Sequence, residues 1–402
     1  MVLGATGFVG RLLAAYLAEH APQNLRVALA GRSRERLEAV RSGLPGSAGR
    51  WPVVVVDTTD ETRVDELARS TRIVVTTVGP YARYGLPLAR ACAVAGTDYA
   101  DLTGEVLYVR DLIDSCHETA VRTGARLVTS CGFDSVPSDL GVHLLFEEAL
   151  REAGEGITDT TLLVTAMSGG FSGGTIGSTR AQLEAITADP AKRKVVFDPF
   201  SLSADRAAEP DGRDQRDPLY IYRDARTGRW TAPFVMAPFN TRIVRRTNSL
   251  RGHAYGPGFR YREAIGFGRD TSGLLRASAL TAALGAGLTA MATPWLRPVA
   301  DRVLPSPGEG PSEEARQNGR FRMELRTTTD SGRRLLAVVS AQGDPGYAAT
   351  SVMLGESALC LAQDGDRLYE GGGVLTPAVA MGDALADRLR AAGFRLTVEA
   401  DA

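Results

Sequence analysis

The sequence contains almost no lysine: its 46 basic residues are arginines except for Lys192 and Lys194. No tyrosine is followed four residues later by a lysine. The chain therefore lacks the Tyr-x-x-x-Lys pair with which short-chain dehydrogenases lower the pKa of a catalytic tyrosine. Any related chemistry has to use other residues.

Cysteine and histidine are also rare. The four cysteines have no C-x-x-C spacing, which argues against a disulfide framework or a zinc site and indicates a reduced, cytoplasmic protein. The four histidines are too dispersed to predict a metal site. The formal net charge of −1 provides no basic field, so we expect no nucleic-acid partner.

The start of the chain carries a glycine pattern. A short apolar run leads into Gly4-x-x-Gly7-x-x-Gly10, and a helical pattern follows over 11–19. Such glycines allow a tight turn, a close approach to a pyrophosphate and close helix–strand packing. We therefore predict that a dinucleotide contacts Gly4, Ala5, Thr6, Gly7, Phe8, Val9 and Gly10. Because strands usually have about 5 to 6 residues, we also expect the natural chain to begin upstream of Met1.

The next apolar run, 25–30, indicates which dinucleotide is bound. It ends in Gly31-Arg32-Ser33-Arg34, where an NAD site would carry a carboxylate for the ribose 2′-hydroxyl. Arg32 and Ser33 suit the 2′-phosphate of NADP(H) instead. The alternative is that Arg32 is only a solvated charge in front of a helix.

The first 145 residues alternate apolar runs with helical patterns, as βαβ units do. Further strands are predicted over 52–56, 72–78, 98–102 and 126–130. We expect a doubly wound parallel sheet, a Rossmann domain of residues 1–150, with its ligand at the carboxyl ends of the strands. The residues that follow these ends are the predicted cofactor contacts Asp57, Val78, Gly79, Pro80, Gly104 and Gly132.

Later residues have a different texture. Strands of a mainly antiparallel sheet are predicted over 158–167, 242–247, 259–267, 319–328 and 334–342, and helices over 177–188, 347–362 and 377–392. The fold class is thus α/β, with a Rossmann domain followed by an α+β domain.

Several distinctive motifs match one family, in order and almost from end to end. They are Gly4-Ala-Thr-Gly-Phe-Val-Gly10, Ala30-Gly-Arg-Ser33, Val78-Gly-Pro-Tyr81, Gly132-Phe-Asp-Ser-Val-Pro-Ser-Asp-Leu-Gly141, Ser172-Gly-Gly-Thr175, Gly310-Pro-Ser-Glu-Glu314, Asp344-Pro-Gly-Tyr347 and Gly371-Gly-Gly-Val-Leu-Thr-Pro377. On these motifs the chain resembles the saccharopine dehydrogenase-like oxidoreductases, specifically the actinobacterial trans-acting enoyl reductase branch.

The resemblance implies an α+β substrate or dimerisation domain over 151–375 and a final helix, within 376–402, that returns to the Rossmann domain. It implies an NADPH-dependent reductase of the α,β-double bond of an acyl thioester, carried by CoA or by a polyketide synthase that lacks its own enoyl reductase. A saccharopine dehydrogenase-like imine or amino-acid oxidoreductase, or a lipid-surface nucleotide-binding protein with little turnover, are the alternatives. A homodimer is compatible with each of them.

Two residues are the candidates for catalysis. Tyr81 has a hydroxyl that either donates a proton to a developing enolate or caps a pocket. Asp134 directly follows a strand end, where it either meets the nicotinamide or caps a helix. Glu105 stands in the same relation to the fifth strand, and Asp139 is best read as a helix cap.

Substrate contacts are predicted in the second domain and at Phe133. The run Ser172, Gly173, Gly174, Thr175 either cradles an acyl or phosphopantetheine group or is a loop that needs positive φ. Arg245 and Tyr255 belong to a cationic stretch that suits a phosphopantetheine arm or an acidic carrier, unless it is an ordinary solvated strand face.

Residues 274–296 are mostly apolar and about as long as a membrane span. Polar residues and glycines dilute the run, so it is a buried or pocket-lining helix, a lipid-contacting surface helix or a transmembrane helix. We expect a soluble enzyme in which this helix lines or gates an acyl pocket and touches lipid peripherally. The stripe toward the protein is predicted to contain Leu274, Ala277, Thr281, Leu284 and Leu288.

Overall fold

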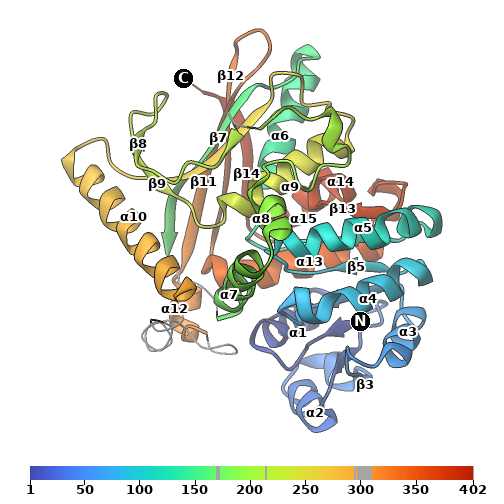
Figure 1. The fold of residues 1–402 in the computed structure, drawn as a ribbon. Helices are drawn as coiled ribbons and strands as arrows, with labels where there is room; N and C mark the ends of the chain where they lie inside the picture. Colours follow the sequence, from blue (N-terminus) through green and yellow to red (C-terminus); the bar gives the residue numbers. More distant parts are fainter. Residues whose placement is uncertain (169–172, 213–214, 294–295, 297–309, 402) are drawn as a thin grey trace.

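The computed structural model describes residues 1–168, 173–212, 215–293, 296 and 310–401. Its first sheet has seven parallel strands in the order β13-β6-β5-β4-β1-β2-β3 (Figure 1). These strands are β1 (Val2–Leu3), β2 (Leu29–Gly31), β3 (Val53–Val55), β4 (Ile73–Thr76), β5 (Asp98–Ala100), β6 (Arg126–Val128) and β13 (Gly373–Leu375). The predicted doubly wound Rossmann sheet is confirmed, although its strands are short.

Helices cover both faces of this sheet. In chain order they are α1 (Phe8–His20), α2 (Arg34–Ser42), α3 (Glu61–Arg69), α4 (Tyr81–Ala95), α5 (Val106–Thr123) and α6 (Val136–Ala153). Because successive residues of a strand face opposite sides, Val2 packs in the core that includes α1 and α2. Leu3 packs in the separate core under α3, α4 and α5. The continuous apolar run of β4 reflects this two-sided burial, whereas β3 at the edge of the sheet is only partly buried.

The C-terminal part of the chain belongs to both sheets. Helix α13 (Thr350–Gln363) packs beside α1, where Tyr16 Oη donates a hydrogen bond of 2.5 Å to Glu356 Oε1. Strand β13 then pairs with β6, so the chain has already returned to the first sheet at Gly373, three residues before 376. Helices α14 (Pro377–Ala380) and α15 (Gly382–Ala391) follow, and the chain ends in β14 (Arg395–Ala400), which joins the second sheet. The helical pattern of the sequence did not predict this last strand.

The second sheet also has seven strands, in the order β14-β12-β11-β7-β10-β9-β8. Its other members are β7 (Asp159–Ser168), β8 (Tyr222–Arg223), β9 (Trp230–Pro233), β10 (Arg260–Gly266), β11 (Arg320–Thr328) and β12 (Arg334–Gln342). Only the β7–β10 pair among these described strands is parallel, so the expected mainly antiparallel sheet is confirmed.

The segments that connect the strands of this sheet contain further helices. They are α7 (Gly173–Ala188), α8 (Pro190–Phe197), α9 (Ala237–Leu250), α10 (Thr271–Ala292) and the short α12 (Glu313–Gln317).

The strand predicted over 242–247 is wrong, because these residues form the middle of α9. The β-branched residues Ile243, Val244 and Thr247 suggested a strand, but the environment is almost completely buried. Each arginine of this segment donates to backbone carbonyls; Arg246, for example, donates to Leu202 O at 2.7 Å and to Val374 O at 2.6 Å. A helix allows these donors to reach several loops at once.

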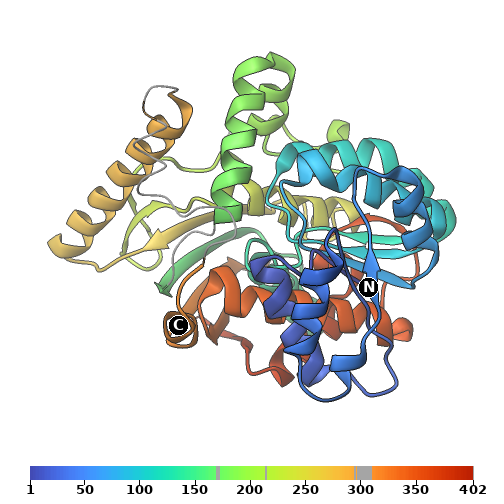
Figure 2. The same ribbon diagram turned by 90° about the horizontal axis from the view of Figure 1, so that it is seen from below.

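Helix α10 lies on the outside of the molecule, away from the parallel sheet (Figures 1 and 2). Among the described residues it is the one helix long and apolar enough to cross a membrane, with a mean hydropathy of 1.3 over its best window. Only 11% of that window is buried, so the buried-helix alternative is wrong.

Candidate active site at the strand ends of the parallel sheet

The glycine turn between β1 and α1 has the geometry that the sequence predicted. Gly4 has φ +83°, in the left-handed region that favours glycine. A Cβ on Gly10 would lie 2.1 Å from Gly4 O, so helix and strand could not approach this closely with any other residue. Gly7 is exposed and precedes the first turn of α1, whose amides receive no side-chain cap from Gly7 or another described residue and can therefore meet an anion. These residues fit a pyrophosphate.

The end of β2 carries no carboxylate. Arg32 is exposed and makes no hydrogen bond or ion pair with the part of the chain that the structure describes. Ser33 Oγ caps α2 by accepting from Arg36 N at 3.3 Å. At the end of β3, hydrogen bonds from Thr59 and, more weakly, the charge of Arg32 hold the pKa of Asp57 below its usual value. Arg32 and Asp57 thus lie near each other, just after the carboxyl ends of the neighbouring strands β2 and β3.

The end of β4 is built around Tyr81, whose side chain is only 6% exposed. Its hydroxyl donates to Thr76 O at 3.2 Å and accepts from Leu102 N at 3.2 Å. Burial, and next the nearby Asp101, raise its pKa well above the usual value. The hydroxyl that the sequence suggested as a proton donor therefore faces the interior and is occupied by backbone groups.

Glu105 is likewise used by the fold. Its carboxylate accepts from Tyr81 N at 2.9 Å and from Ala82 N at 2.8 Å, and so satisfies the first amides of α4. It also accepts from Ser178 Oγ of α7 at 2.6 Å. This contact brings α7, and with it the predicted substrate residues Gly173, Gly174 and Thr175, toward the strand ends; Ser172 lies outside the described residues.

Asp134 differs from these two residues. It is partly exposed after β6, and its carboxylate has no hydrogen bond or ion pair with any residue that the structure describes. A Cβ on Gly104 would lie 3.6 Å from Asp134 Oδ2 and 3.4 Å from Met236 Cε, so these three residues border one space. Burial raises the pKa of Asp134 to about 6.

Asp139 is a cap, as expected, but for a different helix. Its carboxylate accepts from Ala378 N in α14 at 2.8 Å and from Thr247 Oγ1 at 2.5 Å. It is completely buried, and this desolvation raises its pKa to about 6. Asp139 thus ties α6 to the C-terminal segment, whereas Asp134 makes no such contact with the described residues.

Gly132 and Phe133 are closely packed against neighbouring side chains. A Cβ on Gly132 would lie 2.6 Å from Leu102 Cδ2, and Phe133 N donates to Thr350 Oγ1 at 3.0 Å. The Phe133 ring is buried edge-on against Phe321, with centroids 4.9 Å apart. The Phe133 side chain therefore belongs to the hydrophobic core and is not an exposed substrate contact.

Arg245 and Tyr255 do not lie at the strand ends. They are 2% and 0% exposed. Arg245 donates to Pro199 O, Gln215 O and Tyr261 O, and burial lowers its pKa to about 10. The alternative of a solvated strand face is wrong too. Met236 and Ser178 border the site without having any recognisable motif in the sequence.

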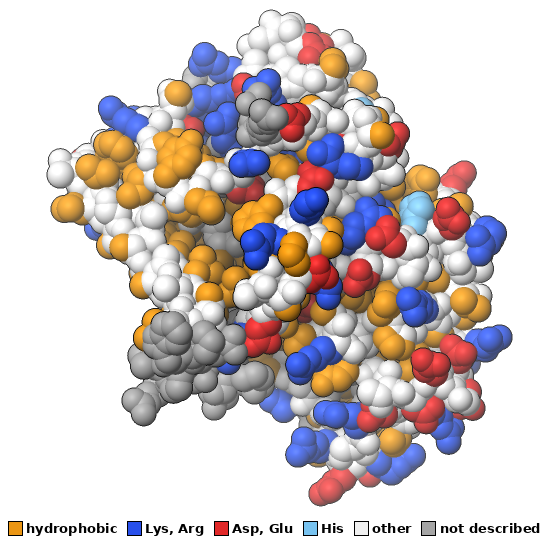
Figure 3. All heavy atoms as spheres, viewed as in Figure 1, with side chains coloured by type: hydrophobic (Ala, Val, Ile, Leu, Met, Phe, Trp, Pro, Cys, Tyr) orange, Lys and Arg blue, Asp and Glu red, His pale blue; other side chains and the backbone are white. Residues whose placement is uncertain are grey.

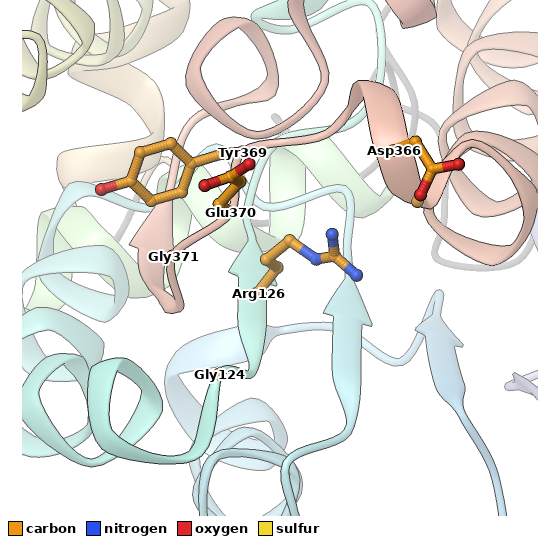
Figure 4. Close-up of a pocket in the computed structure, with 7 residues that line it drawn as sticks. Gly124, Arg126, Asp366, Tyr369, Glu370 and Gly371 are labelled. Carbon is orange, nitrogen blue, oxygen red and sulfur yellow. The ribbon is translucent and has the colours of Figure 1, made fainter.

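Two hollows in the described structure lie elsewhere. One, of about 340 Å³, is at the amino ends of β6 and β13, where Arg126 pairs with Asp98 at 2.7 Å (Figure 4). The other, of about 600 Å³, is lined by Arg245, His253 and Phe200 in the second domain. Parallel sheets bind ligands at the carboxyl ends of their strands, so neither is the expected cofactor site.

Comparison with known proteins agrees with this architecture. Residues 1–128 match the model of the saccharopine dehydrogenase NADP binding domain. A trans-acting enoyl reductase of Mycobacterium ulcerans is 45% identical over 403 residues, covering 98% of this chain and 96% of the relative. One of Mycobacterium tuberculosis is 44% identical over 404 residues, with the same coverage. The chain belongs to this family of saccharopine dehydrogenase-like oxidoreductases.

Solved structures support the fold at low sequence identity. The apo saccharopine dehydrogenase (L-Glu forming) of Saccharomyces cerevisiae is 13% identical, with a TM-score of 0.54 over 100% of this chain and 99% of that one. The homospermidine synthase of Legionella pneumophila, solved with NAD, has a TM-score of 0.50 at 10% identity, over 100% and 90%. Family membership makes the protein an NAD(P)-dependent oxidoreductase.

Proposed function

We propose that the protein reduces the α,β-double bond of an acyl chain held as a thioester on CoA or on a polyketide synthase carrier domain. The observation that carries this proposal is similarity over 98% of the chain to proteins named trans-acting enoyl reductases. At the strand ends, Asp134 has no hydrogen bond or ion pair among the described residues, so its carboxyl could supply the proton that such a reduction needs.

NADPH is the proposed cofactor. The exposed Arg32 would pair with the 2′-phosphate, and the absence of a carboxylate after β2 removes the usual partner of the NAD ribose. The amides around Gly7 would hold the pyrophosphate, and Val78, Gly79, Pro80, Gly104 and Gly132 border the nicotinamide half. When bound, NADPH supplies the hydride for the β-carbon.

Asp134 is the proposed proton donor. A carboxyl whose pKa is near 6 still holds its proton in a useful fraction of molecules close to neutral pH, and donors of this kind work best when their pKa approaches the working pH. Protonated Asp134 would stabilise the enolate oxygen by a hydrogen bond or deliver the proton to the α-carbon. Tyr81 is not part of this proposal, because its hydroxyl is occupied.

Helix α10 is the proposed route for the acyl chain and a peripheral contact with lipid. Ala277 is buried, and Leu274, Thr281 and Leu284 are partly buried on the stripe that the sequence indicated. Leu288, which was predicted on the same stripe, is 40% exposed, so the prediction is wrong for this residue. Leu275, off the stripe, is 66% exposed, so the outer face is apolar as well. Hydrophobic side chains gather over this helix and the adjoining surface in Figure 3.

The test measures NADPH oxidation with a panel of enoyl-CoA thioesters, enoyl-carrier domains and cyclic imines at equal concentration. Oxidation is monitored as the loss of nicotinamide absorbance. We expect turnover with an enoyl thioester and none with the imines. Turnover of imines alone would replace the proposal by the amine-oxidoreductase alternative. Absence of turnover with any member, while NADPH binds, would favour a nucleotide-binding protein without reductase activity.

A further inference from the structure

A buried carboxylate in the second sheet has no cationic partner among the residues that the structure describes. Glu263 lies on β10, is 0% exposed, and stands at a position where a strand facing the core would ordinarily carry an apolar residue. Its oxygens accept from Tyr261 Oη at 2.8 Å and from Asn240 Nδ2 at 2.9 Å. An apolar residue would avoid the cost of desolvating a carboxyl group, so its presence calls for a role other than stability.

Asn240 continues this network into the Rossmann domain. It lies on α9, and its amide donates to Ser138 Oγ at 3.3 Å in addition to Glu263. Its oxygen accepts from Ser135 Oγ at 3.2 Å. Both amide protons and the amide oxygen are therefore used, and Asn240, Ser135 and Ser138 are all 0% exposed. A fully satisfied buried network of this kind defines one geometry.

Two members of the network lie beside the candidate site. Ser135 directly follows Asp134, and Asn240 is one helical turn after Met236, which borders the same space as Asp134 Oδ2. Glu263 thus connects a strand of the second sheet, through one asparagine, to the turn that carries the unpaired carboxylate.

We propose that Glu263 and Asn240 are positioning residues that hold the Asp134 turn and the Met236 wall at a fixed separation across the two domains. The inference rests on the proposed function for the role of Asp134. The hydrogen-bonded connection from Glu263 through Asn240 to this turn does not depend on the identity of the substrate. Hydrophobic packing alone would leave α9 and the turn free to slide, since apolar contacts are not directional.

The experiment compares Glu263→Leu, Glu263→Gln and Ser135→Ala with wild type in the full chain. Glutamine keeps an acceptor for Asn240 and can donate to Tyr261 Oη, which then acts as acceptor. Thr327→Val is the matched control, because it removes a buried 2.7 Å hydrogen bond to Thr160 elsewhere in the same sheet. Amide hydrogen exchange of peptides covering 132–139 and 236–241, the Kd for NADPH, and kcat and KM are measured.

For Glu263→Leu we expect exchange in both peptides to rise about tenfold or more, and kcat to fall about tenfold or more, with the Kd for NADPH within about twofold of wild type. Glu263→Gln should restore exchange and kcat to within about threefold. Ser135→Ala, which removes one hydroxyl and should fold even if Glu263→Leu does not, is expected to raise exchange in 132–139 and lower kcat about threefold or more.

The positioning role of Glu263 and Asn240 would be overturned if Ser135→Ala showed the same exchange and kcat as wild type. It would also be overturned if Thr327→Val changed them as much as Glu263→Leu does. If wild type reduces no enoyl thioester, the proposed function fails. The exchange measurements still decide the positioning role in that case.

Discussion

Replacing Asp134 by asparagine separates a catalytic carboxyl from a structural one. The structure leaves this carboxylate without a hydrogen-bond partner among the described residues, and burial raises its pKa from 3.8 to about 6. A shift of about 2 units corresponds to roughly 3 kcal/mol, and partial exposure reduces this to about 1–2 kcal/mol through solvent screening.

Proton linkage makes the ionised Asp134 carboxyl destabilising to the folded protein. Because the pKa is higher in the folded protein than in the unfolded chain, the native state retains a proton that the unfolded state releases. The carboxyl therefore costs stability progressively as pH rises from about 4 through 6. Asp134→Asn should thus be about 1–2 kcal/mol more stable than wild type at pH 8, while the two proteins converge below about pH 4.

Activity should change in the opposite direction. If protonated Asp134 donates to the substrate, kcat of wild type should decline as pH rises through about 6, in line with its raised pKa. Asp134→Asn should lower kcat by about 10² or more and remove this limb of the profile. Urea unfolding at several pH values and steady-state NADPH oxidation measure the two effects.

Asp139→Asn is the matched control, since its pKa is raised to about 6 by the same cause but its oxygens accept from Ala378 N and Thr247 Oγ1. It should lose stability, because an amide cannot replace both acceptors, and keep kcat per folded molecule. A kcat for Asp134→Asn within threefold of wild type, or a lower stability at pH 8, would refute the assignment of Asp134.

Three further substitutions test separate parts of the structure. Arg32→Ala should weaken NADPH binding by about 10- to 100-fold and leave NADH nearly unchanged; equal losses in a titration would contradict pairing with the 2′-phosphate. Tyr81→Phe should lower the free energy of unfolding by about 1–3 kcal/mol, because Thr76 O and Leu102 N lose a buried partner. A large fall in kcat would instead indicate that Tyr81 is the proton donor. Leu284→Glu should lower kcat/KM for long acyl chains much more than for short ones, and an unchanged ratio in a folded variant would remove α10 from the acyl site.

The sequence alone was sufficient for features set by short-range rules. Gly4 and Gly10 are dictated by backbone geometry within one strand–turn–helix unit, so their spacing predicts the fold of that unit wherever it occurs. Alternating apolar and helical periodicities likewise predict the parallel sheet, and the spacing of three and four residues predicts the inward stripe of α10 from Leu274 to Leu284. For the same reason the strand ends, and with them the position of Asp134, could be located before the structure.

Tertiary packing decided the rest. The helix at α9 depends on a loop and a strand that are distant in sequence and supply the carbonyls of Leu202 and Val374 for Arg246, and no local pattern contains them. Strand β13 pairs with β6 across more than half of the chain, so its membership of the first sheet has no local signal. Above all, Tyr81, Asp134 and Asp139 are equivalent as strand-end or helix-start residues in the sequence. Hydrogen-bond partners from other segments occupy two of them, whereas Asp134 has none within the described part of the chain, because hydrogen bonds depend on three-dimensional proximity and not on sequence position.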